Sequence, residues 1–406
     1  MKKTLFLGLL AGFLSDLYAT DARVIALGGQ DLFFIDEVSI FQNPANIGLY
    51  PDLLYGSLGV YRTGSDSSAN SRYHEPSDPF FGGIASLPFS SDTANRRNRS
   101  AFFLGGFFNR HDEMLDYLDP HSGKYIGNPR DIMIRPSGAV DLLMGYSWRN
   151  GTAIGIGGYA ASGSSTAGPV IDSETSLYKL NAGLRTPLFD NGAVEWSAGT
   201  GLMRAKGDSA GAGVGPVIVA NNDGFFRSDL RIFVPLRNTA TTVVPQLHYS
   251  SMSLYHGKVS LADFSGGIGI NVPLTRGLFW AGLQYLYQDD SYFHDSSSTS
   301  NGGRVSFGIE HYIVGDWLIA RAGGEKVLAY TSTTYSGGAP SRGMVRDKLP
   351  LGGIDSDLLG LGFGFVIKAH LHIDVVVSDD LPYTLGIVSG GSDPYLLSRV
   401  SATYQF

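Results

Sequence analysis

The carboxy-terminal residues 394–406 alternate apolar and polar side chains and stop on an aromatic residue. One face of this predicted strand is apolar and the other is polar, and the two sets are Leu396, Val400, Ala402, Tyr404 and Phe406, and Arg399, Ser401, Thr403 and Gln405. Successive side chains of a strand point to opposite faces. Because the chain ends on the apolar face, no later residue covers it. A protein core, a second sheet or lipid must do so.

The first residues have the three regions of a secretory signal peptide. Lys2 and Lys3 precede an apolar run over residues 5–14, and small residues follow at Ala19 and Ala22. A membrane anchor would need ~20 apolar residues, whereas Asp16 interrupts this run earlier. We therefore expect a signal peptide over residues 1–19, with cleavage after Ala22 as the alternative. An exported chain of this kind is either soluble or a β-barrel.

Composition favours a chain that exposes little surface to water. The 406 residues include 54 glycines, and charged residues make up 17%, against ~25% in typical globular domains. The lack of cysteine excludes a disulfide framework and a thiolate metal site. The net charge of -7 gives no indication of nucleic-acid binding.

Short turns alternate with long loops from residue 53 onward. Turn signals occur in residues 149–151, 190–192, 237–238, 275–277, 315–316 and 368–369. Between most consecutive turns lie two long strands and one Gly/Ser/Asp-rich loop, whereas a propeller blade would hold four short strands. The pattern gives about 16 strands. It predicts an all-β fold, a transmembrane antiparallel β-barrel over residues 51–406.

Within the predicted strands, nearly all charged residues lie on the same face, and the apolar residues lie on the opposite face. This sorting is the strongest sequence argument for a membrane barrel. Apolar residues such as Leu142, Trp196 and Phe307 share the other parity and are expected to face lipid. Arg or Lys on that face costs ~2 to 4 kcal/mol near the bilayer midplane. The residues expected to line the lumen are Asp141, Lys179, Arg185, Glu195, Arg227, Asp229, Arg231, Glu310, His370, His372 and Asp374.

Two groups of these lumen residues allow a second interpretation. The histidines and the aspartate of residues 370–374 have a spacing that would suit a metal ion. Lumen polarity explains them equally well, and we assign no metal. The arginines and the aspartate of residues 227–231 would either bind an anionic head group or pair with carboxylates on neighbouring strands. We favour the ion pairs.

Residues 20–50 do not have the pattern of a barrel strand. Gly28-Gly29 and Asn43-Pro44-Ala45 interrupt any regular element. Ala-Leu-Gly-Gly, an acidic residue further on and Asn-Pro-Ala before the first strand make the chain resemble the FadL-type long-chain fatty-acid transporters and their PorV-like relatives. The resemblance implies a 14-stranded barrel and an N-terminal hatch that contains these five residues. An ordinary amino-terminal turn is the alternative.

Asn43 is expected to fix this hatch to the wall. The proline that follows it has no N–H group to donate. An unpaired buried polar group costs ~1 to 3 kcal/mol. We therefore expect the Asn43 amide to tie the segment to lumen groups, such as those at Arg185 or Arg227.

These features predict passive uptake of hydrophobic small molecules such as fatty acids across an outer membrane. The resemblance implies capture at the loops and release past a shifting hatch. The alternative is a PorV-like barrel that does not transport and binds secreted proteins. Apolar residues that point inward, such as Phe233, Trp280 and Leu286, favour transport, whereas a lumen filled by ion pairs would favour the second role. No catalytic motif is present, so we expect no enzymatic activity and no cofactor.

The last three residues also predict partners. Tyr404-Gln405-Phe406 resembles the assembly signal of bacterial outer-membrane barrels, which implies contact with the barrel-assembly machinery as well as with outer-membrane lipid. Replacing Phe406 with Asp should impair assembly far more than the same change at Gln405, because only Phe406 lies on the lipid face. The heat-modifiable band on a gel measures assembly, and equal losses would contradict the face assignment.

Overall fold

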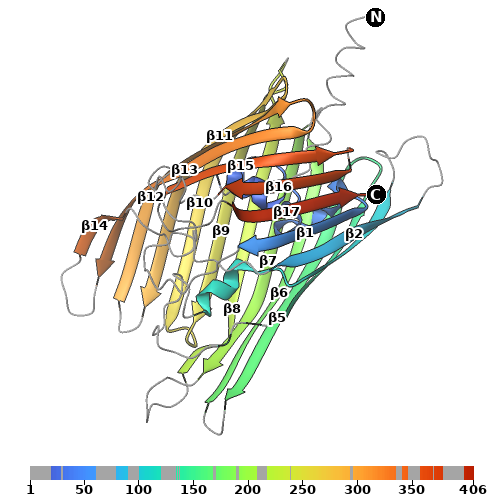
Figure 1. The fold of residues 1–406 in the computed structure, drawn as a ribbon. Coiled ribbons are helices and arrows are strands. Elements are labelled where there is room, and N and C mark those ends of the chain that lie inside the picture. The colour runs from blue at the N-terminus through green and yellow to red at the C-terminus, as the bar shows by residue number, and fades with distance from the viewer. Residues whose placement is uncertain are drawn as a thin grey trace, which may run out of the picture.

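In the computed structural model the chain forms a closed antiparallel β-barrel (Figure 1). The strands are β1 Leu53–Val60, β2 Phe80–Pro88, β3 Ala101–Phe108, β4 Gly138–Ser147, β5 Ala153–Ala167, β6 Ile171–Leu188, β7 Gly192–Gly207, β8 Val217–Pro235, β9 Thr242–Leu254, β10 Val259–Leu274, β11 Gly277–Tyr292, β12 Ser296–Val314, β13 Leu318–Thr334, β14 Ser341–Val345, β15 Asp357–Ile367, β16 Leu371–Val377 and β17 Leu397–Gln405.

The structure describes residues 20–28, 31–60, 79–89, 100–119, 134, 136, 138–167, 171–188, 192–207, 217–237, 239–292, 296–334, 341–345, 357–368, 370–377 and 397–406. The expected signal peptide over residues 1–19, Gly29 and Leu396 lie outside these ranges. No helix among the described residues is long and apolar enough to cross a membrane.

Hydrogen bonds between β17 and β1 close the ring. Leu53 pairs with Gln405 at one end of this ladder, and Val60 lies opposite Arg399 at the other. β1 also pairs with β2, and the remaining strands follow one another around the wall in chain order. The red β17 therefore lies beside the blue β1 in Figure 1.

The wall has 16 strand positions. β14 pairs with residues 329–333 of β13, and β15 pairs with residues 318–326 of the same strand. These two segments occupy successive levels of one position, so that 17 segments make 16 positions. The predicted barrel is confirmed, with the 16 strands that the turn pattern predicts. The 14 strands implied by the resemblance are not observed.

The barrel has a turn end and a loop end. The short connections 148–152, 275–276 and 315–317 lie at the turn end, where the Phe406 N–H donates to the Asp52 carbonyl at 3.0 Å. Strands β5 to β13 have 13 to 19 residues, whereas β15 to β17 and β1 to β4 have 7 to 11. Since ~9 to 11 residues cross a bilayer, the long strands extend beyond it at the loop end.

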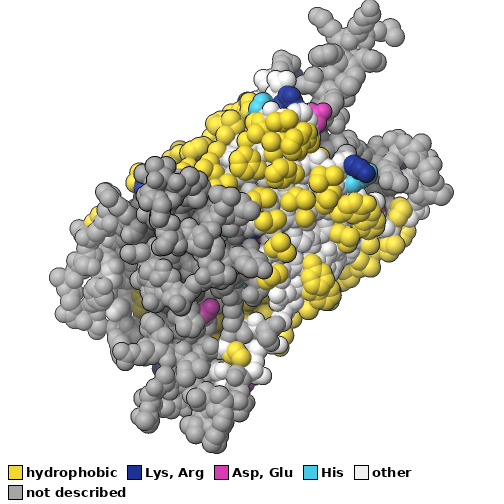
Figure 2. Space-filling view, viewed as in Figure 1, with side chains coloured by type: hydrophobic (Ala, Val, Ile, Leu, Met, Phe, Trp, Pro, Cys, Tyr) yellow, Lys and Arg dark blue, Asp and Glu magenta, His cyan; other side chains and the backbone are white. Residues whose placement is uncertain are grey.

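The outer face carries a band of exposed apolar side chains. Figure 2 shows hydrophobic side chains spread over the visible outer wall. Leu142 is 63% exposed, and Tyr404 and Phe406 are 44% and 62% exposed. Aromatic pairs occur near the turn end, including Tyr146 and Trp148 with ring centroids 4.8 Å apart. Such an apolar band with aromatic margins is the surface that lipid covers in membrane barrels.

Candidate functional site

The lumen at the turn end holds residues 20–28 and 31–50, which we call the N-terminal segment. It contains α2 (Asp21–Ala26), α3 (Ser39–Gln42) and the 3-10 helix η1 (Pro44–Leu49). The Asn43 side chain caps η1 by accepting from the Ala45 N–H at 3.1 Å. Most described side chains of this segment are buried against inner-face residues from strands all around the ring. The segment therefore lies inside the barrel.

Glycines in the wall make room for the Asn-Pro-Ala turn. Gly145, Gly155 and Gly183 pair across β4, β5 and β6 and form one row. A Cβ atom at Gly155 would collide with the backbone of Pro44, and one at Gly183 would collide with the side chain of Asn43. The turn therefore lies directly against the backbone of the wall.

Other wall glycines receive the first part of the segment. Gly269 and Gly282 pair across β10 and β11, and a Cβ atom at either would collide with the ring of Phe33. A further row beneath residues 25–28 consists of Gly308, Gly323 and Gly360. Gly28 adopts a φ of +107°, which favours glycine. Shape complementarity thus fixes the segment at three places.

A chain of buried charges links α2 to the wall. Arg23 lies 3.2 Å from Asp36 and donates two hydrogen bonds to Glu310, at 2.8 and 2.7 Å. Arg321 bridges Glu310 and Asp374. All five side chains are at most 2% exposed. Removing one partner of such a buried pair costs ~3 to 5 kcal/mol, because a charge is left uncompensated.

A second network links the segment to β7 and β8. Glu195 accepts from Arg231 at 2.7 Å, from Arg185, and from the Asn46 amide at 3.4 Å. Arg231 also donates to the Asp31 carbonyl at 2.7 Å. This part of the lumen is filled by ion pairs. The pair of Arg231 with Glu195 is of the kind expected for residues 227–231. Arg227 instead pairs with Asp229 and Glu113.

Asn43 contacts the wall, but not through the expected partners. Its amide donates to the Leu184 carbonyl at 3.4 Å. The predicted hydrogen bonds to Arg185 or Arg227 are not formed. The glycine row brings Asn43 within reach of the wall backbone, and both arginines are paired with carboxylates.

Two adjacent acids of the segment, Asp36 and Glu37, are fully buried. Burial raises the pKa of both carboxyl groups, and for Asp36 the guanidinium of Arg23 opposes this effect. The two side chains are hydrogen-bonded to each other. This arrangement favours the protonated form of Glu37, which would donate to the Asp36 carboxylate.

At the loop end, residues 109–119 turn back into the lumen and form what we call the η3 segment, which contains the 3-10 helix η3 (Glu113–Tyr117). Lys179 lies 2.9 Å from Asp112, and Arg227 lies 2.7 Å from Glu113. Burial works against ionisation of Asp112, but Lys179 and Arg110 hold its pKa below the usual range. These ion pairs fix the η3 segment to the inner wall.

Arg110 connects the η3 segment with the N-terminal segment. Its guanidinium donates to Asp141 at 2.8 and 2.9 Å. It also lies 4.2 Å from the ring centroid of Phe41 in α3 and 5.2 Å from that of Tyr159 in β5. A guanidinium over an aromatic ring is attracted by the ring quadrupole. A displacement of the η3 segment would therefore act on α3.

An apolar cluster fills the space between the η3 segment and strands β5 to β10. The η3 segment contributes Met114, Leu115, Tyr117 and Leu118. The wall contributes large side chains that include Leu177, Met203, Phe225, Met252, Leu254 and Leu261. Barrel lumens are usually polar, so this cluster is the lumen feature best suited to an apolar ligand.

A row of buried polar side chains crosses the inner face of β9 to β13. Its members are Gln246, Gln284, Arg304, Ser306 and Glu325. Gln284 lies opposite Arg304, whose Nε atom is 3.5 Å from Glu325. Several nitrogen and oxygen atoms of this row lack a hydrogen-bond partner within the structure. Because buried polar groups are usually paired, the row is a candidate contact for the polar part of a ligand.

Two predictions about the lumen need correction. His370 is exposed in the turn between β15 and β16, so it does not line the lumen with His372 and Asp374. The described residues contain no group of three His, Cys, Asp or Glu that could hold a metal ion.

Phe233 and Trp280 point inward as expected, but they belong to the cluster of Phe33 and Phe34 and cover the N-terminal segment.

Sequence reasoning missed Arg23, Arg110 and Arg321. Arg321 has the inward parity of β13, so strand alternation contains a signal for it. Arg23 lies in a helix and Arg110 lies beyond the end of β3. Strand parity has no meaning at those two positions.

Comparisons with known proteins concern the fold alone. No protein-family model matches the chain, and no curated protein matches it. It is similar to the solved structure of CdiB from Escherichia coli, with 12% identity and a TM-score of 0.42 over 86% of this chain and 63% of that one. It is also similar to OmpT, an outer membrane protein of Vibrio cholerae, with 10% identity and a TM-score of 0.36 over 87% and 94% of the two chains. The chain covers less than two thirds of CdiB.

The chain has the architecture of an outer-membrane β-barrel. That statement rests on the closed ring and its apolar outer band. Membership of the FadL-type family stays a prediction.

The glycine row yields a test of how the N-terminal segment is held. Gly155→Val should displace the Asn-Pro-Ala turn, because the new side chain would occupy the position of Pro44. Trypsin should then cleave after Arg23, which is 2% exposed in the folded protein. Gly138→Val is the matched control on the paired strand, since nothing lies within 4 Å of a Cβ there. Equal protection in both variants would contradict the role of the row.

The raised pKa values of Asp36 and Glu37 predict a pH dependence of stability. A carboxyl group whose pKa is raised by folding binds more protons in the folded state, so stability falls as pH rises above the ordinary carboxyl value of ~4. The melting temperature of the wild type in detergent should therefore fall between pH 5 and pH 9. Glu37→Gln should reduce this fall, because the amide carries no titrating proton. The same pH dependence in both proteins would refute the assignment.

Proposed function

We propose that the protein is a bacterial outer-membrane channel for passive uptake of hydrophobic small molecules such as fatty acids. The expected signal peptide and the apolar outer band support this location. The apolar cluster beneath the η3 segment is the single observation that carries the uptake function. We assign no enzymatic activity and no cofactor as part of this proposal.

The lumen has two layers that suit capture and release. A ligand from outside first meets the η3 segment, whose ion pairs hold it over the apolar cluster. An apolar ligand would replace the contacts of Leu115 and Leu118 with its own, at a gain of roughly 25 cal/mol per Å² of apolar surface buried. Movement of the η3 segment would pull Arg110 away from Phe41.

Release would require the N-terminal segment to shift. It fills the turn-end layer, and its five predicted hatch residues are Gly28, Gly29, Asn43, Pro44 and Ala45. Four of them lie in described parts of the lumen, and Gly29 lies outside the described residues. Arg110 supplies a physical connection between ligand capture and this shift.

The second candidate is a PorV-like barrel whose loops bind secreted proteins. One observation favours it: the turn-end layer is held by glycine rows and buried ion pairs, which suit a permanent filling. A fixed filling would leave the loop end as the only functional surface.

Deletion of residues 21–47 distinguishes the two candidates. If the segment closes the pore, the deletion should raise single-channel conductance in planar bilayers, and uptake of a fluorescent fatty acid into proteoliposomes should increase. Leu177→Glu should lower uptake by the full-length protein, because it places a charge in the apolar cluster. Asp316→Asn, at a position 97% exposed in a turn outside the lumen, serves as the control. Unchanged conductance and uptake in a folded deletion variant would remove the main support for transport.

A further inference from the structure

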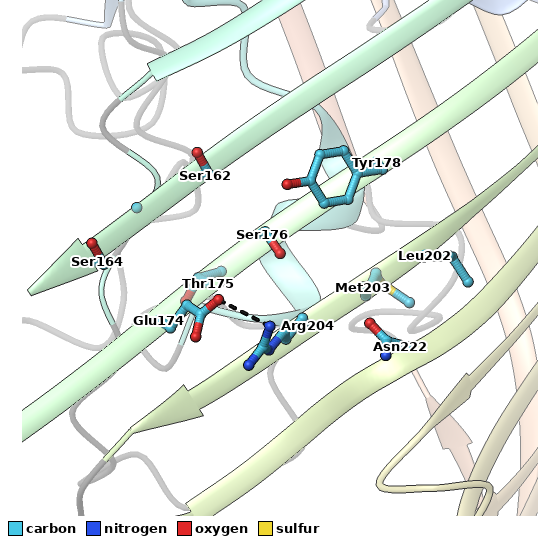
Figure 3. Close-up of a pocket in the computed structure, with 11 residues that line it drawn as sticks. Ser162, Ser164, Glu174, Thr175, Ser176, Tyr178, Leu202, Met203, Arg204 and Asn222 are labelled. Atoms are coloured by element: carbon cyan, nitrogen blue, oxygen red, sulfur yellow. Dashed lines mark ion pairs between the residues drawn. The ribbon is translucent and has the colours of Figure 1, made fainter.

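A cavity of about 770 Å³ lies in the wall near the loop end (Figure 3), and it shares Met203 with the apolar cluster of the lumen. Strands β5 to β8 form it, and its polar lining includes Ser162, Ser164, Glu174, Ser176, Arg204 and Asn222. Tyr178 and Leu202, which are 55% and 51% exposed, line its apolar side. These two residues belong to the outer face, so the cavity opens to the outside of the barrel.

The apolar outer face ends at one level on three neighbouring strands. Tyr178 pairs with Ala160 and Leu202. Two residues further toward the loop end, the paired residues are Ser162, Ser176 and Arg204. After two more residues they are Ser164, Glu174 and Lys206. Because all nine positions have the same parity, the change from apolar to polar marks the level at which lipid chains end and head groups begin.

The polar side of the cavity is lined by Glu174 and Arg204, and Lys206 beside the lining adds a second cation. Glu174 lies 3.2 Å from Arg204 and 3.4 Å from Lys206. The three side chains are 33%, 41% and 36% exposed, and the ion pair of Glu174 with Arg204 is drawn in Figure 3. Partly exposed pairs of this kind are weak and exchange partners readily. A phosphate group would match both cations, since a guanidinium binds it through two parallel hydrogen bonds.

A β-bulge aims a further polar group at the same place. Met203 pairs with Asp223 and Arg204 pairs with Asn221, so Asn222 has no partner in the ladder. Its φ of +60° places it in the left-handed region, where asparagine is tolerated. Bulges redirect side chains. In Figure 3 the Asn222 side chain lies beside those of Met203 and Arg204, which also line the cavity.

We propose that this cavity binds the phosphate-bearing head group of an outer-leaflet lipid. Arg204 and Lys206 contact the phosphate, the hydroxyl groups of Ser162 and Ser176 donate to its oxygens, and the acyl chains run over Tyr178 and Leu202. The short turns assign the other end of the barrel to the periplasm, so the lipid comes from the outer leaflet. The volume suits one head group, since small-ligand pockets measure ~300–1,000 Å³.

The test measures lipid binding to the full-length protein in detergent by native mass spectrometry. The probes are diphosphorylated lipid A, the same lipid with its phosphates removed, and inorganic phosphate as a competitor. The variants are R204Q/K206Q, E174Q and the control R276Q. Arg276 is 44% exposed and pairs with Asp316 at the turn end, far from the cavity along the strands. Heat modifiability establishes that each variant is folded.

The double variant should bind diphosphorylated lipid A about tenfold more weakly, because both charge-assisted contacts are lost. E174Q should bind it more tightly, since a competing carboxylate is removed, and R276Q should equal the wild type. Equal binding by the double variant, or an equal loss in R276Q, would overturn the proposal. So would equal affinity of the wild type for the dephosphorylated lipid. Full displacement of the lipid by millimolar inorganic phosphate would show a free-anion site instead.

Discussion

Backbone hydrogen bonding in lipid requires a closed ring, and the pairing of β17 with β1 supplies it. No water is present in the bilayer core to satisfy an open edge. The same strand also contacts the lumen contents, because Arg399 lies 2.9 Å from Asp21 and the Ala22 N–H donates to Ser401 at 3.3 Å. Closure of the wall and placement of α2 therefore depend on one strand. The apolar face of this strand meets lipid, and its polar face meets the N-terminal segment.

The buried charges in the lumen determine where α2 lies more than they stabilise the folded protein. Taking Arg23 and Glu310 out of water costs several kcal/mol per ion, and their attraction offsets this only when the geometry is good. Two hydrogen bonds between them meet that condition. Any other position of α2 would break this pair and leave Glu310 with Arg321 alone and Arg23 with Asp36 alone. The glycine rows act in the same direction, because the contacts of Pro44 with the wall exist at only one register.

Much of the fold, and part of the site, could be predicted from the sequence. The alternation of apolar and polar residues was enough to predict the strands and their faces. Residues that face lipid are apolar and those that face the lumen are polar, as at Leu142 and Asp141. The alternation failed for His370, which has the right parity but lies beyond the end of a strand. The glycine row could not be predicted, because it becomes a row only when the register of three strands is known. The wall partner of Arg23, Glu310, is likewise 287 residues away in the sequence.

The physical difference between the two lumen layers limits how a channel of this design would work. The loop-end layer is apolar and held at its margin by ion pairs, so an apolar ligand can replace its contacts in kind. The turn-end layer is held by shape and buried charge, and no apolar ligand can replace those interactions. Passage would therefore require a movement that keeps Arg23 and Glu310 paired while Phe41 and the turn beside Gly155 separate from the wall. Arg110 joins the two layers through its guanidinium over the ring of Phe41, so such a movement would have to change this contact.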